Sequence, residues 1–152
     1  MLHIFIDADA CPVKDEIYKV SKRHDLRVTV VSNMWMRTPS EPWIDIIVVK
    51  GDLDAADDWI AEHVEADDIV ITADIPLASR CLKAGGRVLG PRGRPFTEDS
   101  IGEALAGREI QAHLRELGAG NSGPPPFVKQ DRSRFLQELD VMIHAVKKAR
   151  SS

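Results

Sequence analysis

Five aspartates at three places along the chain are the residues best suited to chemistry. They are Asp7, Asp9, Asp54, Asp57 and Asp74. Carboxylates crowded at one site repel one another and need hard cations to neutralise them. Ligation by oxygen alone suits Mg²⁺ or Mn²⁺ and not zinc. Two such ions held a few ångströms apart can activate a water, orient a phosphodiester and stabilise the leaving oxygen.

Short apolar runs alternate with segments of helical spacing in the first part of the chain. Strands are expected over residues 2–6, 26–31, 44–49, 69–72 and 87–89, and helices after Pro12 and over residues 54–65, 75–84, 100–117 and 131–149. This alternation predicts an α/β fold with a mostly parallel five-stranded sheet and helices on both faces. A Gly/Pro-rich connector over 118–126 is too short to suggest an independent unit. Residues 1–152 are therefore expected to form one domain, with a βα core (1–97) and a helical C-terminal extension (98–152).

The predicted strands explain why these aspartates could meet. Asp7 and Asp9 follow the first strand, Asp54 and Asp57 follow the third, and Asp74 follows the fourth. The carboxyl ends of parallel strands line the crevice where ligands bind. We therefore expect a shared metal site there. The alternative for Asp7 and Asp74 is a structural one, in which each caps the helix that follows it.

Helical spacing ranks the acids of the segment that begins at Asp54. At about 100° per residue, Asp57 borders the apolar face of the predicted helix, while Asp54 and Asp58 lie further toward solvent. Asp57 is ranked first as a ligand and Asp54 second, and Asp58 is expected to be a surface charge. Asp67 and Asp68 precede a strand, at the wrong edge of the sheet, and are expected to be turn residues.

Composition excludes several classes of protein. The chain has 152 residues, of which 43% are hydrophobic, and its net charge is −4. No apolar run approaches the roughly 18 to 20 residues of a membrane span, and the N-terminus has no signal-peptide pattern, so we expect a cytoplasmic protein with no membrane partner. Two cysteines and five histidines show no disulfide framework and no ligand pair at metal spacing. The mild acidity argues against a highly basic nucleic-acid coat protein.

Basic residues supply candidate contacts to a phosphate. Residues 41–74 contain eleven acidic residues and one basic residue, whereas residues 75–97 contain five basic and no acidic ones. Arg92 and Arg94, in a Gly/Pro loop, and Lys14, in a first helical turn, are the candidates for substrate binding. The alternative is that these side chains are solvated or paired with a neighbouring carboxylate.

Aromatic residues in the predicted loop 33–43 allow two interpretations. Trp35, Met36 and Trp43 could stack on unpaired bases, but anchoring the loop on its own core is the favoured interpretation. Cys11 precedes Pro12 at a helix N-terminus, which lowers a thiol pKa. Because no histidine partner is evident, Cys11 is interpreted as a small packing or capping residue.

Two longer motifs resemble a known family. Residues 6–14 (Ile-Asp-Ala-Asp-Ala-Cys-Pro-Val-Lys) and 71–78 (Ile-Thr-Ala-Asp-Ile-Pro-Leu-Ala) resemble the signature motifs of the YaiI/YqxD family, bacterial proteins of uncharacterised function. Residues 54–60, 91–93 and 121–127 also match the family, so the resemblance spans nearly the whole chain.

The family is similar in turn to PIN-like (NYN-type) nucleases, which implies a PIN-like three-layer sandwich and a metal-dependent ribonuclease. Those enzymes have an Asp after the first strand, acids at the start of a middle helix, and an Asp in a Thr-x-Asp-x-x-Leu-Ala context after the fourth strand. Asp7, Asp54 or Asp57, and Asp74 fall at these places. The chain departs from the pattern in lacking a clear match for the fourth, downstream acid.

Three functional hypotheses follow. The leading one is an endoribonuclease that cleaves single-stranded RNA with Mg²⁺ or Mn²⁺ at Asp7, Asp57 and Asp74, assisted by Asp9 and Asp54. The second is a haloacid-dehalogenase-like phosphatase that uses Asp7 and Asp9 as nucleophile and acid. The third is a non-catalytic module that binds RNA or a ribosomal partner, which the missing fourth acid favours.

Overall fold

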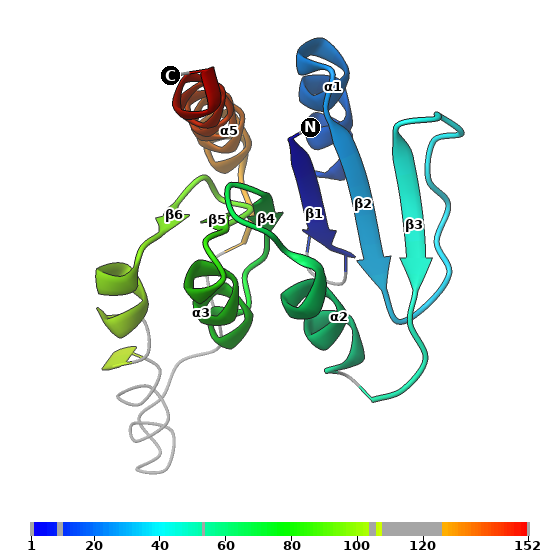
Figure 1. Ribbon diagram of the computed structural model, residues 1–152, viewed down its shortest axis with the longest axis horizontal. Helices are drawn as coiled ribbons and strands as arrows, with labels where there is room; N and C mark the ends of the chain where they lie inside the picture. The colour runs from blue at the N-terminus through cyan, green and yellow to red at the C-terminus, as the bar shows by residue number, and fades with distance from the viewer. Residues whose placement is uncertain (1, 9–10, 53, 104–105, 108–125, 152) are drawn as a thin grey trace.

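The computed structural model describes residues 2–8, 11–52, 54–103, 106–107 and 126–151, and its centre is a six-stranded sheet (Figure 1). The strands lie in the order β3-β2-β1-β4-β5-β6. Their bounds are β1 (His3–Asp7), β2 (Arg27–Ser32), β3 (Ile44–Val48), β4 (Ile69–Ile71), β5 (Arg87–Leu89) and β6 (Pro95–Phe96). The first five are parallel, as predicted.

The sixth strand corrects the prediction of five. β6 pairs antiparallel with β5 at the edge of the sheet. It is two residues long and begins with Pro95. A segment this short carries no apolar alternation, and proline is tolerated only at such edge positions, so nothing in the sequence pattern indicated a strand.

Helices cover both faces of the sheet, which gives the expected three-layer sandwich. Their bounds are α1 (Lys14–His24), α2 (Ala55–His63), α3 (Ile75–Lys83) and α5 (Lys129–Ser151), and residues 98–103 are also helical. Ile4 and Ile6 of β1 belong to the core on the side of α1 and α5, whereas Phe5 belongs to the core beneath α2 and α3. This alternation along a strand divides the apolar residues between the two helical layers.

The C-terminal helix packs back on the sheet, as expected. Phe135, Leu139, Ile143 and Val146 of α5 are fully buried at helical spacing in the same core cluster as α1. Gly93, in the loop after β5, has φ +87° and packs against the first turns of α5. A Cβ at this position would lie 2.6 Å from the backbone carbon of Arg134. Only glycine fits that contact, which fixes the loop after β5 against α5.

Most of the remaining element predictions hold. Gly85 follows α3 with a positive φ, which is the expected helix terminator. α1 begins at Lys14, two residues after the Pro12 expected to open it. The predicted helix 100–117 corresponds to helical residues 98–103, and residues 108–117 with most of the connector lie outside the described part. No described helix is long and apolar enough to cross a membrane.

Candidate functional site at the carboxyl edge of the sheet

Asp7 is the last residue of β1 and is buried, with 8% of its surface exposed. Its Oδ2 accepts a 2.8 Å hydrogen bond from the hydroxyl of Thr72, which follows the neighbouring strand β4. The N-cap of α1 is Val13, with no side-chain capping bond, so the structural alternative of a helix cap is wrong for Asp7. Burial at a strand end penalises the ionised form of this carboxylate, and the hydrogen bond from Thr72 offsets part of that penalty.

Asp74 does cap a helix. Its Oδ1 accepts a 2.8 Å hydrogen bond from the Leu77 N–H at the start of α3, and its own N–H donates to the Thr72 hydroxyl at 3.0 Å. The structural alternative is thus right for Asp74, but the cap uses one carboxylate oxygen. Thr72 contacts both acids, accepting from the Asp74 backbone and donating to the Asp7 side chain. It fixes the two aspartates relative to each other.

Asp57 shows that the acids from different elements meet. It lies in the first turn of α2 and is partly buried. Burial, and then repulsion from Asp7, Asp74, Asp54 and Asp58, raises the pKa of Asp57 to about 7. Repulsion of this kind requires that these carboxylates lie near one another. Asp7, Asp54 and Asp74 therefore all lie within electrostatic reach of Asp57, and a shared metal site at this edge stays a prediction.

The ranking of the α2 acids agrees with their exposure. Asp57 is partly buried, and Asp54 is exposed, with its backbone N–H bonded to the Asp52 side chain. Asp58 is also exposed and forms a 2.7 Å ion pair with Arg80, so its interpretation as a surface charge is confirmed. Asp9, the fifth candidate, lies outside the described residues.

The separation of these carboxylates is consistent with their mutual repulsion. Among the described residues, the one group of three His, Cys, Asp or Glu with ligand atoms all within 4.8 Å of one another lies elsewhere in the fold. The aspartates at the edge thus interact electrostatically, but their oxygens do not lie as close together as the ligands of a bound ion would. Their oxygen-only donor set fits a hard divalent cation, whose charge would draw them together.

Lys14 and Cys11 lie beside Asp7 at the start of α1. The Lys14 ammonium donates to the Cys11 carbonyl at 2.9 Å. The pKa of the Cys11 thiol is raised to about 11, mainly by burial, although a hydrogen bond with the Val13 backbone and the charge of Lys14 lower it; Asp7 adds to the rise. Burial therefore outweighs the helix N-terminus, and Cys11 is a protonated packing residue, as interpreted. Lys14 and Asp7 are thus each close enough to the Cys11 thiol to shift its pKa.

The two loop arginines differ in their surroundings. Arg92 forms a 3.2 Å ion pair with Asp131, donates to the Pro126 carbonyl at 3.4 Å, and lies over the Phe127 ring. These contacts anchor the start of α5. Arg94 is exposed. Phosphate binding by Arg92 and Arg94 stays a prediction, and for Arg92 it would compete with these structural contacts.

The loop between β2 and β3 contains both anchored and exposed large side chains. Met36 and Trp43 are partly buried and pack against the core, which confirms the anchoring interpretation for these two. Trp35 is 72% exposed and Met34 is 76% exposed, so that interpretation is wrong for Trp35. An exposed indole near a strand end is available for stacking.

Sequence reasoning missed two polar residues at this edge. Thr72 is 2% exposed, and only the register of β4 beside β1 shows that its hydroxyl reaches Asp7. Asn33 follows β2 and donates through Nδ2 to the Asp52 carbonyl at 3.2 Å, while its Oδ1 is buried with no hydrogen-bond partner. An uncompensated buried oxygen near the Asp54 loop is a further candidate ligand for a cation.

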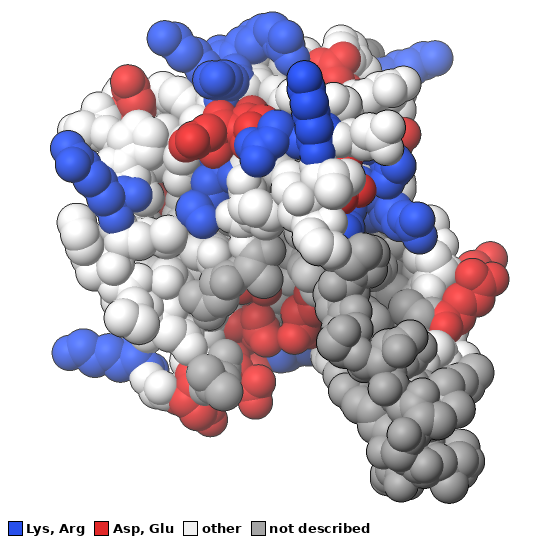
Figure 2. Space-filling view, turned by 180° about the vertical axis from the view of Figure 1, so that it is seen from behind, with Lys and Arg blue, Asp and Glu red and all other residues white. Residues whose placement is uncertain are grey.

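The distribution of surface charge supports this location. Figure 2 shows acidic side chains gathered at the lower end of the molecule, which is the carboxyl end of the parallel strands in Figure 1. Most of the Lys and Arg side chains visible in that view lie on the upper half. On this face, the acidic side chains at the lower end are thus set apart from most of the visible basic ones.

Fold and site together define a class of three-layer α/β proteins that gather carboxylates at the carboxyl ends of parallel strands. The chain belongs to the YaiI/YqxD family, because the family model described as "Uncharacterized BCR, YaiI/YqxD family" matches residues 5–145. It is similar to UPF0178 proteins of Paramagnetospirillum magneticum (57% identical, 97% of this chain, 98% of the relative) and Rhodospirillum centenum (54%, 99% and 100%). A UPF0178 protein of Caulobacter vibrioides is 56% identical over 96% of this chain and 95% of its own length. No solved structure matches the chain.

Proposed function

We propose that the protein is a divalent-metal-dependent endoribonuclease whose site is the acidic edge formed by Asp7, Asp57 and Asp74. The observation that carries the proposal is the crowding at Asp57, whose pKa of about 7 reflects burial and repulsion from three other candidate ligands. Carboxylates kept together against repulsion are typical of functional sites, because folding gains nothing from their proximity. The proposed PIN-like resemblance supports hydrolysis of RNA phosphodiesters.

The residues of the acidic edge would have different roles in such a site. Asp7, Asp57 and Asp74, assisted by Asp54 and Asp9, would hold Mg²⁺ or Mn²⁺. When bound, the metal would activate a water and stabilise the leaving oxygen. Thr72 holds Asp7 and Asp74 in a fixed relation through its two hydrogen bonds. With a pKa of about 7, Asp57 is half protonated near neutral pH and must lose that proton to become a ligand.

A single-stranded substrate is supported by the groups beside the acids. Lys14 and Asp7 both act on the Cys11 thiol, and the charge of Lys14 can contact a phosphate bound beside the acids. Trp35 is exposed in the loop that follows β2, where its ring can stack on an unpaired base. Double-stranded RNA does not present bases for such stacking. We therefore expect cleavage of single strands and of loops in preference to duplexes.

The test is an assay of end-labelled single-stranded RNAs with Mn²⁺, Mg²⁺ or excess EDTA. We expect Mn²⁺-dependent cleavage that Asp7→Asn, Asp57→Asn and Asp74→Asn each reduce by roughly a hundredfold or more. Asp58→Asn is the matched control, since Asp58 lies on the same helix but is exposed and paired with Arg80. An intact RNA panel, or equal cleavage by the wild type and Asp57→Asn, would contradict the proposal.

Two other outcomes correspond to the alternatives. RNA binding without cleavage, together with a melting temperature that Mn²⁺ leaves unchanged, would indicate a non-catalytic RNA- or ribosome-binding module. Release of phosphate from small phosphomonoesters, lost in Asp7→Asn but kept in Asp57→Asn, would indicate the haloacid-dehalogenase-like phosphatase. Asp57 separates the two enzymes because that phosphatase hypothesis assigns catalysis to Asp7 and Asp9.

A further inference from the structure

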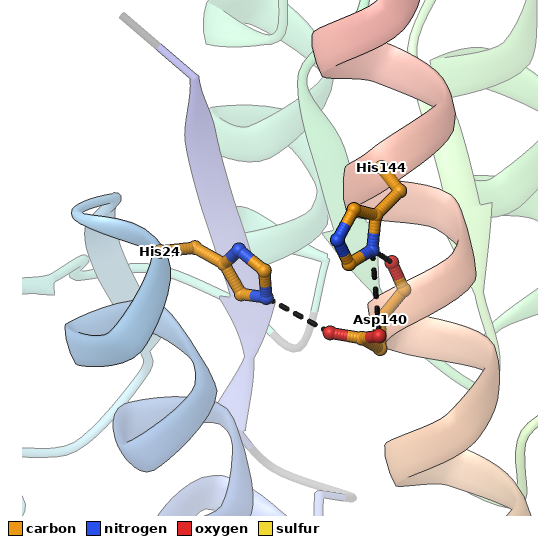
Figure 3. Close-up of side chains that lie close together, drawn as sticks. All are labelled: His24, Asp140 and His144. Carbon is orange, nitrogen blue, oxygen red and sulfur yellow. Dashed lines mark hydrogen bonds and ion pairs between the residues drawn. The ribbon is translucent and has the colours of Figure 1, made fainter.

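A second cluster of ligand-type side chains lies where α1 meets α5 (Figure 3). His24 is the last residue of α1, and Asp140 and His144 are one turn apart on α5. His24 Nε2 lies 2.8 Å from Asp140 Oδ1, and His144 Nδ1 lies 3.4 Å from Asp140 Oδ2. One ligand atom from each of the three residues lies within 4.8 Å of the other two. Sequence spacing did not indicate this group, because His24 lies far from Asp140 and His144 along the chain.

The donor set differs in chemical type from that of the acidic edge. Two imidazole nitrogens and one carboxylate oxygen suit Zn²⁺, Co²⁺, Ni²⁺ or Cu²⁺ and not Mg²⁺. Zinc bonds of about 2.0–2.2 Å place tetrahedral donors roughly 3.3–3.5 Å apart. The His144–Asp140 separation is near this range, the His24–Asp140 separation is shorter, and all three atoms lie within 4.8 Å of one another. Side-chain rotations that also release His144 Nδ1 from its 2.8 Å contact with the Asp140 backbone carbonyl would bring the three atoms around one ion.

The surroundings allow those rotations and leave room for a fourth ligand. The His24 side chain is 11% exposed, so packing holds it in place. The side chains of Asp140 and His144 are 40% and 63% exposed. The buried ligand therefore sets the position of an ion, and the two exposed ligands adjust to it. Solvent on their open side supplies a water for the remaining coordination position.

Basic side chains near the cluster repel a bound metal ion and lower its affinity. Lys147 Nζ lies 3.3 Å from His24 Nδ1 and donates to the His24 carbonyl at 3.2 Å. Arg23 lies 3.8 Å from Asp140 Oδ1. A metal-bound His24 would carry a proton on Nδ1, which an ammonium cannot accept, so Lys147 must turn away when the ion binds. Substitution of Lys147 should therefore change the metal affinity of the site.

We propose that His24, Asp140 and His144 form a binding site for one zinc-type transition-metal ion, separate from the acidic edge. α1 begins beside Asp7 and ends at His24, so the two sites lie at opposite ends of this helix. An ion bound there joins α1 directly to the C-terminal helix. It therefore stabilises the docking of α5 on the sheet.

The experiment titrates the full chain with Zn²⁺ in competition with a coloured chelator, and with Co²⁺ followed by visible absorption. We expect a Co²⁺ spectrum with nitrogen ligation, and Zn²⁺ binding at this site that is about tenfold or more weaker in His144→Gln and in His24→Gln. His144 is largely exposed, so its variant tests the site even where His24→Gln fails to fold. Lys147→Met should bind Zn²⁺ roughly tenfold tighter, because it removes a charge near the ion.

His63→Gln is the matched control, because His63 bonds only locally, to the Trp59 carbonyl one turn earlier. It should bind Zn²⁺ like the wild type. Equal Zn²⁺ affinity in the wild type and His144→Gln would overturn the proposal, as would loss of the nitrogen-ligated Co²⁺ spectrum in His63→Gln. No zinc binding at millimolar concentration would overturn it as well.

Discussion

The two ends of α1 lie beside two polar clusters that differ in charge and in origin. The acidic edge consists of carboxylates that repel Asp57, whereas in the cluster of His24, Asp140 and His144 two imidazole rings lie beside one carboxylate. A bound cation would reduce the repulsion between the carboxylates of the acidic edge. In the histidine cluster it would have to displace existing hydrogen bonds. The acidic edge should therefore depend on a metal for charge balance, and the histidine cluster should not.

The origin of the two clusters also differs. β1, β4 and the start of α2 supply the acids, so the parallel topology alone brings them to one edge. The histidine cluster exists only because α5 docks on α1 across 116 residues of separation. One cluster is therefore a property of the sheet and the other a property of helix packing.

The largest expected effect tests the docking of α5. Phe135 is fully buried, so Phe135→Ala should lower the free energy of unfolding by about 3–5 kcal/mol in urea denaturation, through lost burial and a residual cavity. Val141→Ala on the same helix is the control, because Val141 is 56% exposed and should change stability by less than about 0.5 kcal/mol. A loss below about 1 kcal/mol for Phe135→Ala would show that α5 is not part of the core.

The next effect tests the strain at the acidic edge through its pH dependence. The folded pKa of Asp57 is about 7, against an ordinary value of 3.8, so the folded state binds the extra proton. Stability from this group is full below about pH 4 and falls as pH rises through 7. In EDTA, Asp57→Asn should therefore be more stable than the wild type at pH 8 but not at pH 4. The shift sets a ceiling of about 4 kcal/mol, reduced by partial exposure.

Saturating Mn²⁺ should reverse that order at pH 8, because the ion stabilises the ionised form in the wild type and has lost a ligand in the variant. Melting temperatures of both proteins, with and without Mn²⁺ at pH 4 and pH 8, make the comparison. A difference between the two proteins that stays constant with pH would contradict the assignment of strain to Asp57.

A smaller effect is expected from the residue that connects two of the acids. Thr72→Val removes the hydrogen bond to the Asp7 carboxylate and the acceptor for the Asp74 N–H. Bonds to charged groups contribute about 1.5–3 kcal/mol, and we expect a loss of that size in the free energy of unfolding. Mn²⁺ affinity should also fall about tenfold, because the two carboxylates lose their fixed relation. Thr72→Ser keeps the hydroxyl and should retain most of both properties.

Periodicity and topology explain how much of this was predictable. The strands β1, β2 and β4 are nearly continuous apolar runs, and Asp57 stands at a definite angle on its helix, so the fold class and the ranking of Asp57 followed from the sequence. The role of Thr72 depends on strand register. The spacing of Asp140 and His144, four residues apart on one helix, places two ligand-type side chains on the same face. The third, His24, joins them only through tertiary packing, which the sequence does not reveal. Trp35 and Trp43 share one loop, and composition did not distinguish the exposed ring from the anchored one.

The smallest expected effect on stability compares these two tryptophans. Trp35 is exposed, so Trp35→Ala should change the free energy of unfolding by no more than about 0.5 kcal/mol, while Trp43→Ala should cost clearly more because its ring packs against the core. RNA binding should show the opposite order. Stacking contributes about 1–3 kcal/mol per base, so Trp35→Ala should weaken binding of a single-stranded oligonucleotide by roughly five- to a hundredfold in fluorescence anisotropy. Unchanged RNA binding in Trp35→Ala would show that the indole does not contact the substrate. Lys14 and the acidic edge would then be the remaining contacts to test.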